Sequence, residues 1–227
     1  MATPIMESLQ TPWFYAVWAV ASYLVGSLVV GDLICRVKGI DIRTLGTGNP
    51  GAANIWREVG PRYGVLVFAL DIVKGVAATV PLYILDMPTW FITVAMLCLL
   101  AGQFFPLFFG FDGNTGMAAM FGATAGLIPL GAAIAAPVAL GKFAITRNVG
   151  WSGGVFFATA WVAGGLLHDT FNLLHGSWWA VGAAILGGVL VFGKQVVQYK
   201  WMRGGSPTGF SREANDEKRK RSAEENS

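Results

Sequence analysis

The sequence predicts an all-α integral membrane protein with seven transmembrane helices. Hydrophobic residues make up 54% of the 227 residues and charged residues only 13%, with a mean hydropathy of +0.55. A soluble domain has about a quarter of its residues charged. Apolar runs long enough to cross a bilayer, which takes about 20 residues each, recur along the chain. We therefore expect one membrane domain over residues 1–205 and a disordered, charged cytoplasmic tail over 206–227.

The first expected span, residues 13–35, has aromatic and small residues at informative positions. Trp13, Tyr15 and Trp18 are placed where an interfacial aromatic belt lies in a membrane protein. Gly26 and Gly31 allow a neighbouring helix to approach closely. The later expected spans are 62–85, 88–111, two short spans within 117–145, 151–167 and 177–199.

Residues 117–145 are open to two interpretations, one long tilted helix or two short helices broken near Pro129. The Lys and Arg residues outside the spans form three groups, at 36–62, at 142–147 and from 194 onward. A break places all three groups on one side of the membrane, as the positive-inside rule requires. We therefore predict the break, with the N-terminus outside and the C-terminus in the cytoplasm.

The most distinctive stretch is a glycine-rich loop between two apolar segments, G-T-G-N-P-G-A-A-N-I-W-R over Gly46–Arg57. Glycine lets backbone N–H groups approach a ligand, and successive N–H groups can cradle an anion. Arg57 adds a guanidinium that can bind phosphate or carboxylate with two hydrogen bonds. The alternative is a tight Asn-Pro-Gly turn that only joins two helices.

Other polar residues are expected to share this membrane face. A second glycine loop covers Asp112–Gly116, and a polar turn covers Thr146–Asn148. Asp71 and Lys74 are three residues apart in an apolar helix, so they can pair. Such residues mark either a functional site or a neutralised pair that locks helices together, and both readings stay open.

Several kinds of chemistry find no support in the sequence. We expect Cys35 and Cys98 to be small buried hydrophobic residues, and His168 and His175 to lie in an outer loop. We find no nucleophile–histidine set, no metal-ligand spacing, no cofactor motif and no sign of a nucleic-acid partner. Acyl transfer from a substrate with a good leaving group, such as an acyl phosphate, needs mainly positioning and charge stabilisation.

Further runs carry a resemblance to a known family. They are G-S-L-V-V-G from Gly26, G-I-D-I-R from Gly39, the first glycine loop, Y-G-V-L-V-F-A-L-D-I-V-K-G from Tyr63, and T-R-N-V from Thr146. Over residues 22–205 the chain resembles the bacterial acyl-phosphate-dependent glycerol-3-phosphate acyltransferases of the PlsY type.

The resemblance implies seven transmembrane helices in the cell membrane with a cytoplasmic active face. It also implies acyl transfer from acyl phosphate to the 1-hydroxyl of glycerol 3-phosphate, without cofactor or metal, giving lysophosphatidic acid for phospholipid synthesis. The implied catalytic residues are Thr47, Asn54 and Arg57. The implied substrate- and phosphate-binding residues are Gly46, Gly48, Asn49, Gly51, Lys74, Gly113, Thr115, Gly116 and Arg147.

The chain departs from the family pattern outside the first loop. Gln103 occupies the position of a usual histidine, and Thr115 occupies the position of the lysine in G-G-K-G. Lys194–Tyr199 replaces the run H-R-E-N-I. In the first loop Thr47 keeps the hydroxyl of a usual serine, while Ala53 replaces a threonine.

These departures leave two alternatives to the enzyme. One is a catalytically impaired relative that binds a lipid phosphate or scaffolds a partner. The other is a small transporter for a phosphorylated metabolite, suggested by Asp71, Lys74 and the break near Pro129.

Overall fold

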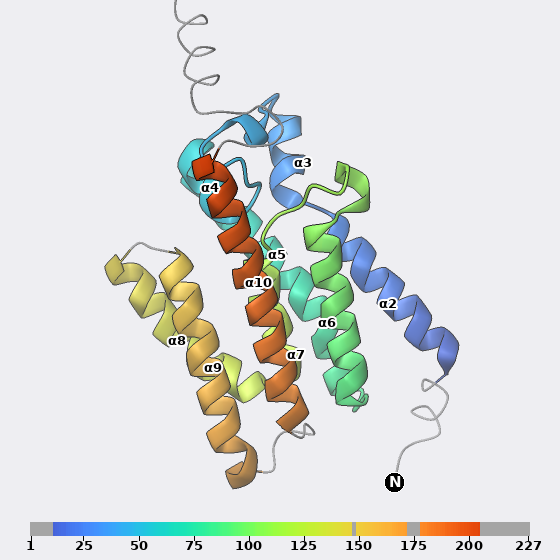
Figure 1. Ribbon diagram of the computed structural model, residues 1–227. Helices are drawn as coiled ribbons and strands as arrows, with labels where there is room; N and C mark the ends of the chain where they lie inside the picture. The colour runs from blue at the N-terminus through green and yellow to red at the C-terminus, as the bar shows by residue number, and fades with distance from the viewer. Residues whose placement is uncertain (1–10, 147–148, 172–177, 205–227) are drawn as a thin grey trace, which may run out of the picture.

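The computed structural model describes the backbone of residues 11–146, 149–171 and 178–204 (Figure 1). All regular secondary structure in these ranges is helical, which confirms the all-α part of the predicted fold class. The helices are α2 (Pro12–Ser27), α3 (Val30–Val37), η1 (Ile42–Thr44), α4 (Ala52–Glu58), α5 (Pro61–Ile84), α6 (Thr89–Phe104), η2 (Leu107–Phe109), α7 (Met117–Leu127), α8 (Pro129–Thr146), α9 (Val149–Phe171) and α10 (Trp178–Gly204).

Within the described residues, three helical segments are long and apolar enough to cross a membrane, namely Pro61–Ile84, Thr89–Phe109 and Trp179–Gln198. The bent pair α2 and α3 makes a fourth if it counts as one span. Helix α7 has 11 residues and rises about 16 Å, roughly half the thickness of a bilayer core. The seven-span count and the sidedness of the termini therefore stay predictions, and residues 206–227 lie outside the described residues.

The first span is not the continuous helix that we expected over residues 13–35. It ends at Ser27, restarts at Val30 and bends by 43°. The carbonyl oxygen of Leu28, inside the break, accepts a hydrogen bond of 2.6 Å from the Nζ atom of Lys74. The break thus supplies a backbone acceptor for a buried ammonium group, which no pattern within residues 13–35 could reveal.

The predicted break near Pro129 is confirmed. Helix α7 ends at Leu127, Ile128 has a non-helical backbone (φ −138°, ψ 69°), and α8 begins at Pro129. Proline lacks an N–H donor and restricts the residue before it to extended conformations, so it favours a helix start at this point.

Small residues let two pairs of helices touch through their backbones. A Cβ atom on Gly26 or Gly102 would overlap a backbone carbonyl oxygen of the facing helix, which joins α2 to α6. A Cβ atom on Gly75 or Gly122 would likewise overlap a backbone carbonyl oxygen of the facing helix, which joins α5 to α7. The close approach predicted at Gly26 is confirmed, as expected for helices that pack without a solvent-driven hydrophobic force.

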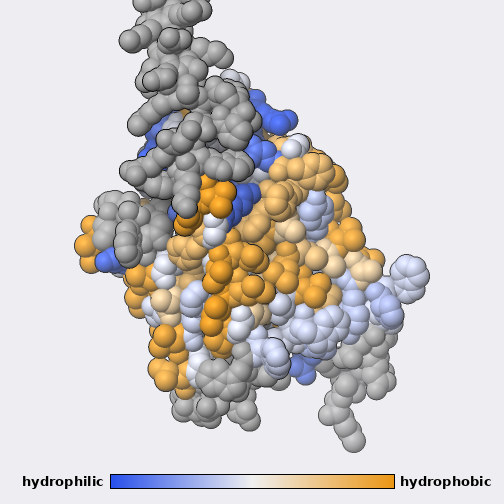
Figure 2. All heavy atoms as spheres, viewed as in Figure 1, coloured by the Kyte–Doolittle hydropathy of each residue, from blue (hydrophilic) through white to orange (hydrophobic). Residues whose placement is uncertain are grey.

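The two ends of the molecule differ in character. Hydrophilic residues gather at the end that carries α3 and α4, next to a broad apolar surface (Figure 2). Aromatic residues occupy the other end, where the ring centroids of Tyr15 and Trp90 lie 5.3 Å apart near the starts of α2 and α6 (Figure 1). Trp18 nearby donates to the Ala78 carbonyl at 2.9 Å. This arrangement agrees with an interfacial aromatic belt opposite a polar face.

Candidate functional site

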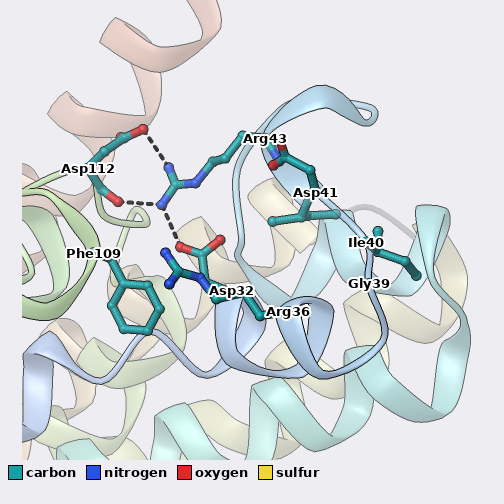
Figure 3. Close-up of a pocket in the computed structure, with 9 residues that line it drawn as sticks. Asp32, Arg36, Gly39, Ile40, Asp41, Arg43, Phe109 and Asp112 are labelled. Carbon is teal, nitrogen blue, oxygen red and sulfur yellow. Dashed lines mark hydrogen bonds and ion pairs between the residues drawn. The ribbon is translucent and has the colours of Figure 1, made fainter.

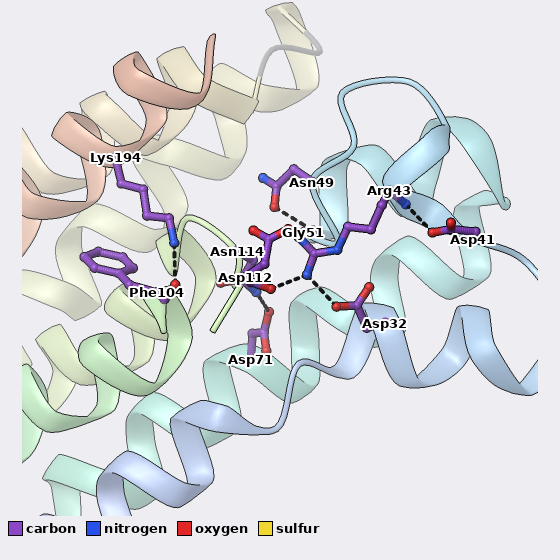
Figure 4. Close-up of polar contacts among 10 residues, drawn as sticks. All are labelled: Asp32, Asp41, Arg43, Asn49, Gly51, Asp71, Phe104, Asp112, Asn114 and Lys194. Carbon is purple, nitrogen blue, oxygen red and sulfur yellow. Dashed lines mark hydrogen bonds and ion pairs between the residues drawn. The ribbon is translucent and has the colours of Figure 1, made fainter. Parts of the chain in front are cut away.

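An arginine just before the first glycine-rich loop contacts the second loop at the polar end. Arg43, in η1, donates from Nη2 to Oδ2 of Asp32 in α3 at 2.7 Å (Figure 4). Its Nη1 atom lies 2.8 Å from Oδ2 of Asp112, at the start of the second loop, and Nη2 also donates to the Asp112 carbonyl oxygen. The side-chain oxygen of Asp41 fixes the start of η1 by accepting from the Arg43 N–H at 3.0 Å. The guanidinium fork thus holds α3, η1 and the second loop in one arrangement.

A pocket of about 520 Å³ opens beside this contact (Figure 3). Its lining comes from α3, the segment through η1, η2 and the second loop, and consists of Asp32, Arg36, Gly39, Ile40, Asp41, Ile42, Arg43, Phe109 and Asp112. The guanidinium of Arg36 lies over the Phe109 ring, 4.8 Å from its centroid. The lining is therefore rich in charge at the edge of an apolar bundle.

The first glycine loop is organised by Asn54. This residue is 2% exposed, and its Oδ1 accepts from the Thr47 N–H at 3.0 Å while its Nδ2 donates to the Leu45 carbonyl at 3.0 Å. Gly46 faces the Asn54 side chain with a φ of +54°, where a Cβ atom would collide with the amide oxygen. A glycine is required there for both conformation and space.

The loop amides donate mostly within the loop itself. The N–H of Gly48 donates to the Leu45 carbonyl at 2.9 Å, that of Asn49 to Thr47 Oγ1 at 3.4 Å and that of Gly51 to Asn49 Oδ1 at 3.2 Å. These hydrogen bonds describe a shaped turn in which the N–H groups already have acceptors. The anion-binding roles expected for Gly46, Gly48, Asn49 and Gly51 stay predictions.

The second loop is fixed against the end of α6. The Asn114 N–H donates to the Gln103 carbonyl at 2.9 Å, and Asn114 Oδ1 accepts from the Gly116 N–H at 2.8 Å. A Cβ atom on Gly113 would overlap the Gln103 carbonyl oxygen. Thr115, at the position of the family's lysine, is half-buried. The loop is a tight structure whose amides lie close to the α6 terminus.

The predicted pairing of Asp71 and Lys74 is confirmed. Lys74 Nζ lies 2.6 Å from Asp71 Oδ1, and both side chains are less than 10% exposed. Asn114 Nδ2 and Gln103 Nε2 each lie 3.5 Å from the Asp71 carboxylate (Figure 4 draws the Asn114 contact). Since Lys74 also donates to Leu28, the pair connects the α2–α3 break to the second loop. The substrate-binding role expected for Lys74 is untested, but its contacts are those of a structural lock.

Among the remaining predicted site residues, the structure describes the surroundings of some and not of others. Thr47 is half-buried in the first loop, whereas Arg57 is exposed in the last turn of α4 and does not line the pocket. Arg147 lies outside the described residues, as does His175, and the side chain of His168 is not described.

Sequence reasoning missed four side chains at this end, Asp32, Arg43, Asp112 and Lys194. The sequence indicates Arg43 only as a marker of the membrane boundary, and Lys194 only as a basic residue at the start of the stretch that replaces H-R-E-N-I. The available signal was Asp32, a carboxylate within an apolar run that needs a cationic partner.

Comparison with known proteins decides the family. A family model described as glycerol-3-phosphate acyltransferase matches residues 16–200. The chain belongs to this family. A glycerol-3-phosphate acyltransferase of Aquifex aeolicus is 39% identical over 129 residues, which cover 56% of this chain and 67% of that protein. One of Halalkalibacterium halodurans is 38% identical over 143 residues, covering 62% of this chain and 69% of the relative.

Solved structures of the family agree with the fold. The crystal structure of PlsY, an integral membrane glycerol 3-phosphate acyltransferase, in its glycerol 3-phosphate form matches with a TM-score of 0.70 and 29% identity. A second PlsY structure, in the lysophosphatidic acid form, matches with a TM-score of 0.67 and 28% identity. Each match covers 84% of this chain and 92% of the PlsY chain. The resemblance drawn from the sequence motifs is confirmed at the level of the family.

Proposed function

We propose that this chain transfers a fatty acyl group from acyl phosphate to the 1-hydroxyl of glycerol 3-phosphate at the cytoplasmic face of the cell membrane. The hydroxyl oxygen forms a new ester bond to the acyl carbon, and the bond from that carbon to the phosphate oxygen breaks. The products are lysophosphatidic acid and inorganic phosphate, with the hydroxyl proton taken up by a phosphate oxygen or by water.

The observation that carries the proposal is that Arg43, in η1 just before the first glycine loop, contacts both α3 and the second glycine loop at the polar end of an apolar bundle. One substrate has a long apolar chain and the other is a water-soluble phosphate, so they meet only at such a boundary. The likeness to PlsY in its glycerol 3-phosphate and lysophosphatidic acid forms supports the same substrates here.

The reaction needs little general acid–base catalysis by protein side chains. Phosphate is a good leaving group, so orientation and stabilisation of developing negative charge supply most of the rate. We assign the positioning of the reacting groups to Thr47 and Asn54 and charge stabilisation to Arg57.

The test is phosphate release by the purified protein in detergent. Palmitoyl phosphate should be consumed only when glycerol 3-phosphate is present, with lysophosphatidic acid detected by mass spectrometry. Glycerol in place of glycerol 3-phosphate, and palmitoyl-coenzyme A in place of the acyl phosphate, are the matched controls. A folded protein that binds a phosphorylated lipid such as palmitoyl phosphate but forms no product is instead the lipid-phosphate-binding relative.

We also propose seven spans with the N-terminus outside and the tail of residues 206–227 in the cytoplasm. Labelling of single cysteines at positions 8 and 215 in intact cells and in inverted vesicles tests this. The native Cys35 and Cys98 are first replaced by alanine, which small buried hydrophobes should tolerate. Labelling of position 215 from outside intact cells would overturn the assignment.

A further inference from the structure

We propose that Lys194 of α10 binds the phosphate group of a substrate beside the second glycine loop. This inference rests on the proposed function, since it names a contact in the same site. It concerns a residue that stands in the stretch Lys194–Tyr199, far along the chain from both glycine loops.

The packing of α10 on the end of α6 brings Lys194 to the second loop. Its Nζ atom donates to the Phe104 carbonyl at 2.8 Å and lies 4.8 Å from the centroid of the Phe104 ring (Figure 4). The preceding carbonyl, that of Gln103, accepts from the Asn114 N–H at 2.9 Å. Gly116 packs against the same ring, since a Cβ atom there would lie 3.3 Å from Phe104. The ammonium group and the loop therefore both contact the C-terminal end of α6, where they share Phe104.

Unlike Arg43 and Lys74, the two cations of the site that form ion pairs, Lys194 has no carboxylate partner among the described residues. Arg43 lies 2.7 Å from Asp32, and Lys74 lies 2.6 Å from Asp71. No carboxylate of the described residues lies within 4.0 Å of Lys194, which is half-buried beneath aromatic rings. A partly desolvated ammonium group has three donors, and the Phe104 carbonyl takes one, so two remain for an anion.

An anion that pairs with the Lys194 ammonium group has to come from a bound ligand. The carboxylates of Asp32, Asp112 and Asp71 are already paired with Arg43 and Lys74. The second loop, residues 112–116, contains no basic residue of its own. A phosphate placed between this loop and α10 would meet the tight loop backbone, the hydroxyl of Thr115 and the cation of Lys194. Both substrates of the proposed reaction carry such a phosphate, so the experiment separates them.

If Lys194 had a purely structural role, its replacement would have a different effect. Lys194 lies within the candidate span Trp179–Gln198, close to its C-terminal end, where lysines commonly extend towards lipid headgroups. Loss of such a lysine lowers thermal stability or disturbs membrane insertion, but leaves the Michaelis constants of the folded enzyme unchanged.

The experiment compares Lys194→Met, Lys194→Arg and the matched control Lys38→Met in the full chain. Lys38 is exposed, and its Nζ atom lies 4.4 Å from the centroid of the Tyr63 ring. In Lys194→Met we expect the KM for one phosphate substrate to rise about tenfold or more, with kcat within about threefold and Tm unchanged. Lys194→Arg should recover most of the affinity, and Lys38→Met should behave as wild type.

The substrate whose KM rises identifies the phosphate. A rise for glycerol 3-phosphate alone assigns Lys194 to the acceptor, and a rise for palmitoyl phosphate alone assigns it to the donor. If both KM values of folded Lys194→Met stay within twofold of wild type, the inference is wrong.

A binding measurement keeps this inference separate from the proposed function. Isothermal titration of glycerol 3-phosphate, palmitoyl phosphate and inorganic phosphate needs no turnover. If wild type binds a phosphate without reacting, the proposed function fails, while a tenfold weaker Kd in Lys194→Met still supports Lys194. Equal affinity in both proteins, or no phosphate binding by wild type, overturns the inference.

Discussion

The guanidinium of Arg43 lies 2.8 Å from the carboxylate of Asp112, although 69 residues separate them in the chain. The same guanidinium lies 2.7 Å from Asp32 in α3. Because these contacts use the planar fork of one side chain, the position of the second glycine loop relative to α3 and η1 depends on it. Changes at Arg43 should therefore affect the whole polar end.

Arg43→Lys should lower kcat/KM by about tenfold or more, because a lysine keeps the charge but cannot hold two carboxylates in a fixed plane. Tm should also fall by a few degrees. Acyl transfer assays and thermal unfolding in detergent measure both effects. Arg36→Lys is the control for charge in the pocket, since Arg36 only overlies Phe109.

The two carboxylate partners of Arg43 should contribute unequally. Asp32 is 8% exposed at its side chain, whereas Asp112 is 74% exposed and screened by solvent. Asp32→Asn should therefore lower Tm clearly more than Asp112→Asn does. An equal loss in the two variants would contradict a clamp anchored on α3.

Arg57→Ala should reduce kcat/KM by about a hundredfold and leave Tm unchanged. Arg57 is exposed and forms none of the ion pairs among the described residues, so its removal costs no packing. A loss of activity then reports on contact with substrate charge. Arg62→Ala, which removes a guanidinium 4.8 Å from the Tyr63 ring centroid, should stay fully active. Full activity in Arg57→Ala would place the chemistry away from the first loop.

Lys74→Met should destabilise the protein strongly, because it leaves the Asp71 carboxylate buried without a counter-charge. Breaking a buried pair typically costs about 3–5 kcal/mol. The double variant Asp71→Asn/Lys74→Met should recover part of that loss, which thermal unfolding of the three variants would measure. A folded Lys74→Met with unchanged Tm and a raised KM for glycerol 3-phosphate would instead assign Lys74 to substrate binding.

Gly113→Ala should lower both Tm and activity, since the new Cβ atom meets a backbone carbonyl that cannot move aside. Overpacking of this kind costs about 1–3 kcal/mol. The control is Gly141→Ala in α8, where no atom lies within 4 Å of the new Cβ and a helical alanine is favourable. Wild-type stability in Gly113→Ala would mean that the second loop does not pack against α6 as described.

Local patterns were sufficient for much of the fold. Apolar runs predicted the helices, Pro129 predicted the break between α7 and α8, and Gly26 predicted a close helix contact. The pairing of Asp71 with Lys74 also followed from their spacing. Each of these features has a local signal in the sequence, a single residue or a short spacing, although the partner that Gly26 meets, Leu99 of α6, is set by the tertiary structure.

By itself, the sequence determined the all-helical class, the family and the first glycine loop. Only the tertiary structure decided that α2 and α3 are separate helices, that Arg43 joins α3 to the second glycine loop, and that Lys194 reaches the end of α6. The reason is that a charged side chain finds its partner by distance in space. Leu28 and Lys74 are 46 residues apart, and Phe104 and Lys194 are 90 apart, so the packing of helices alone brings them together.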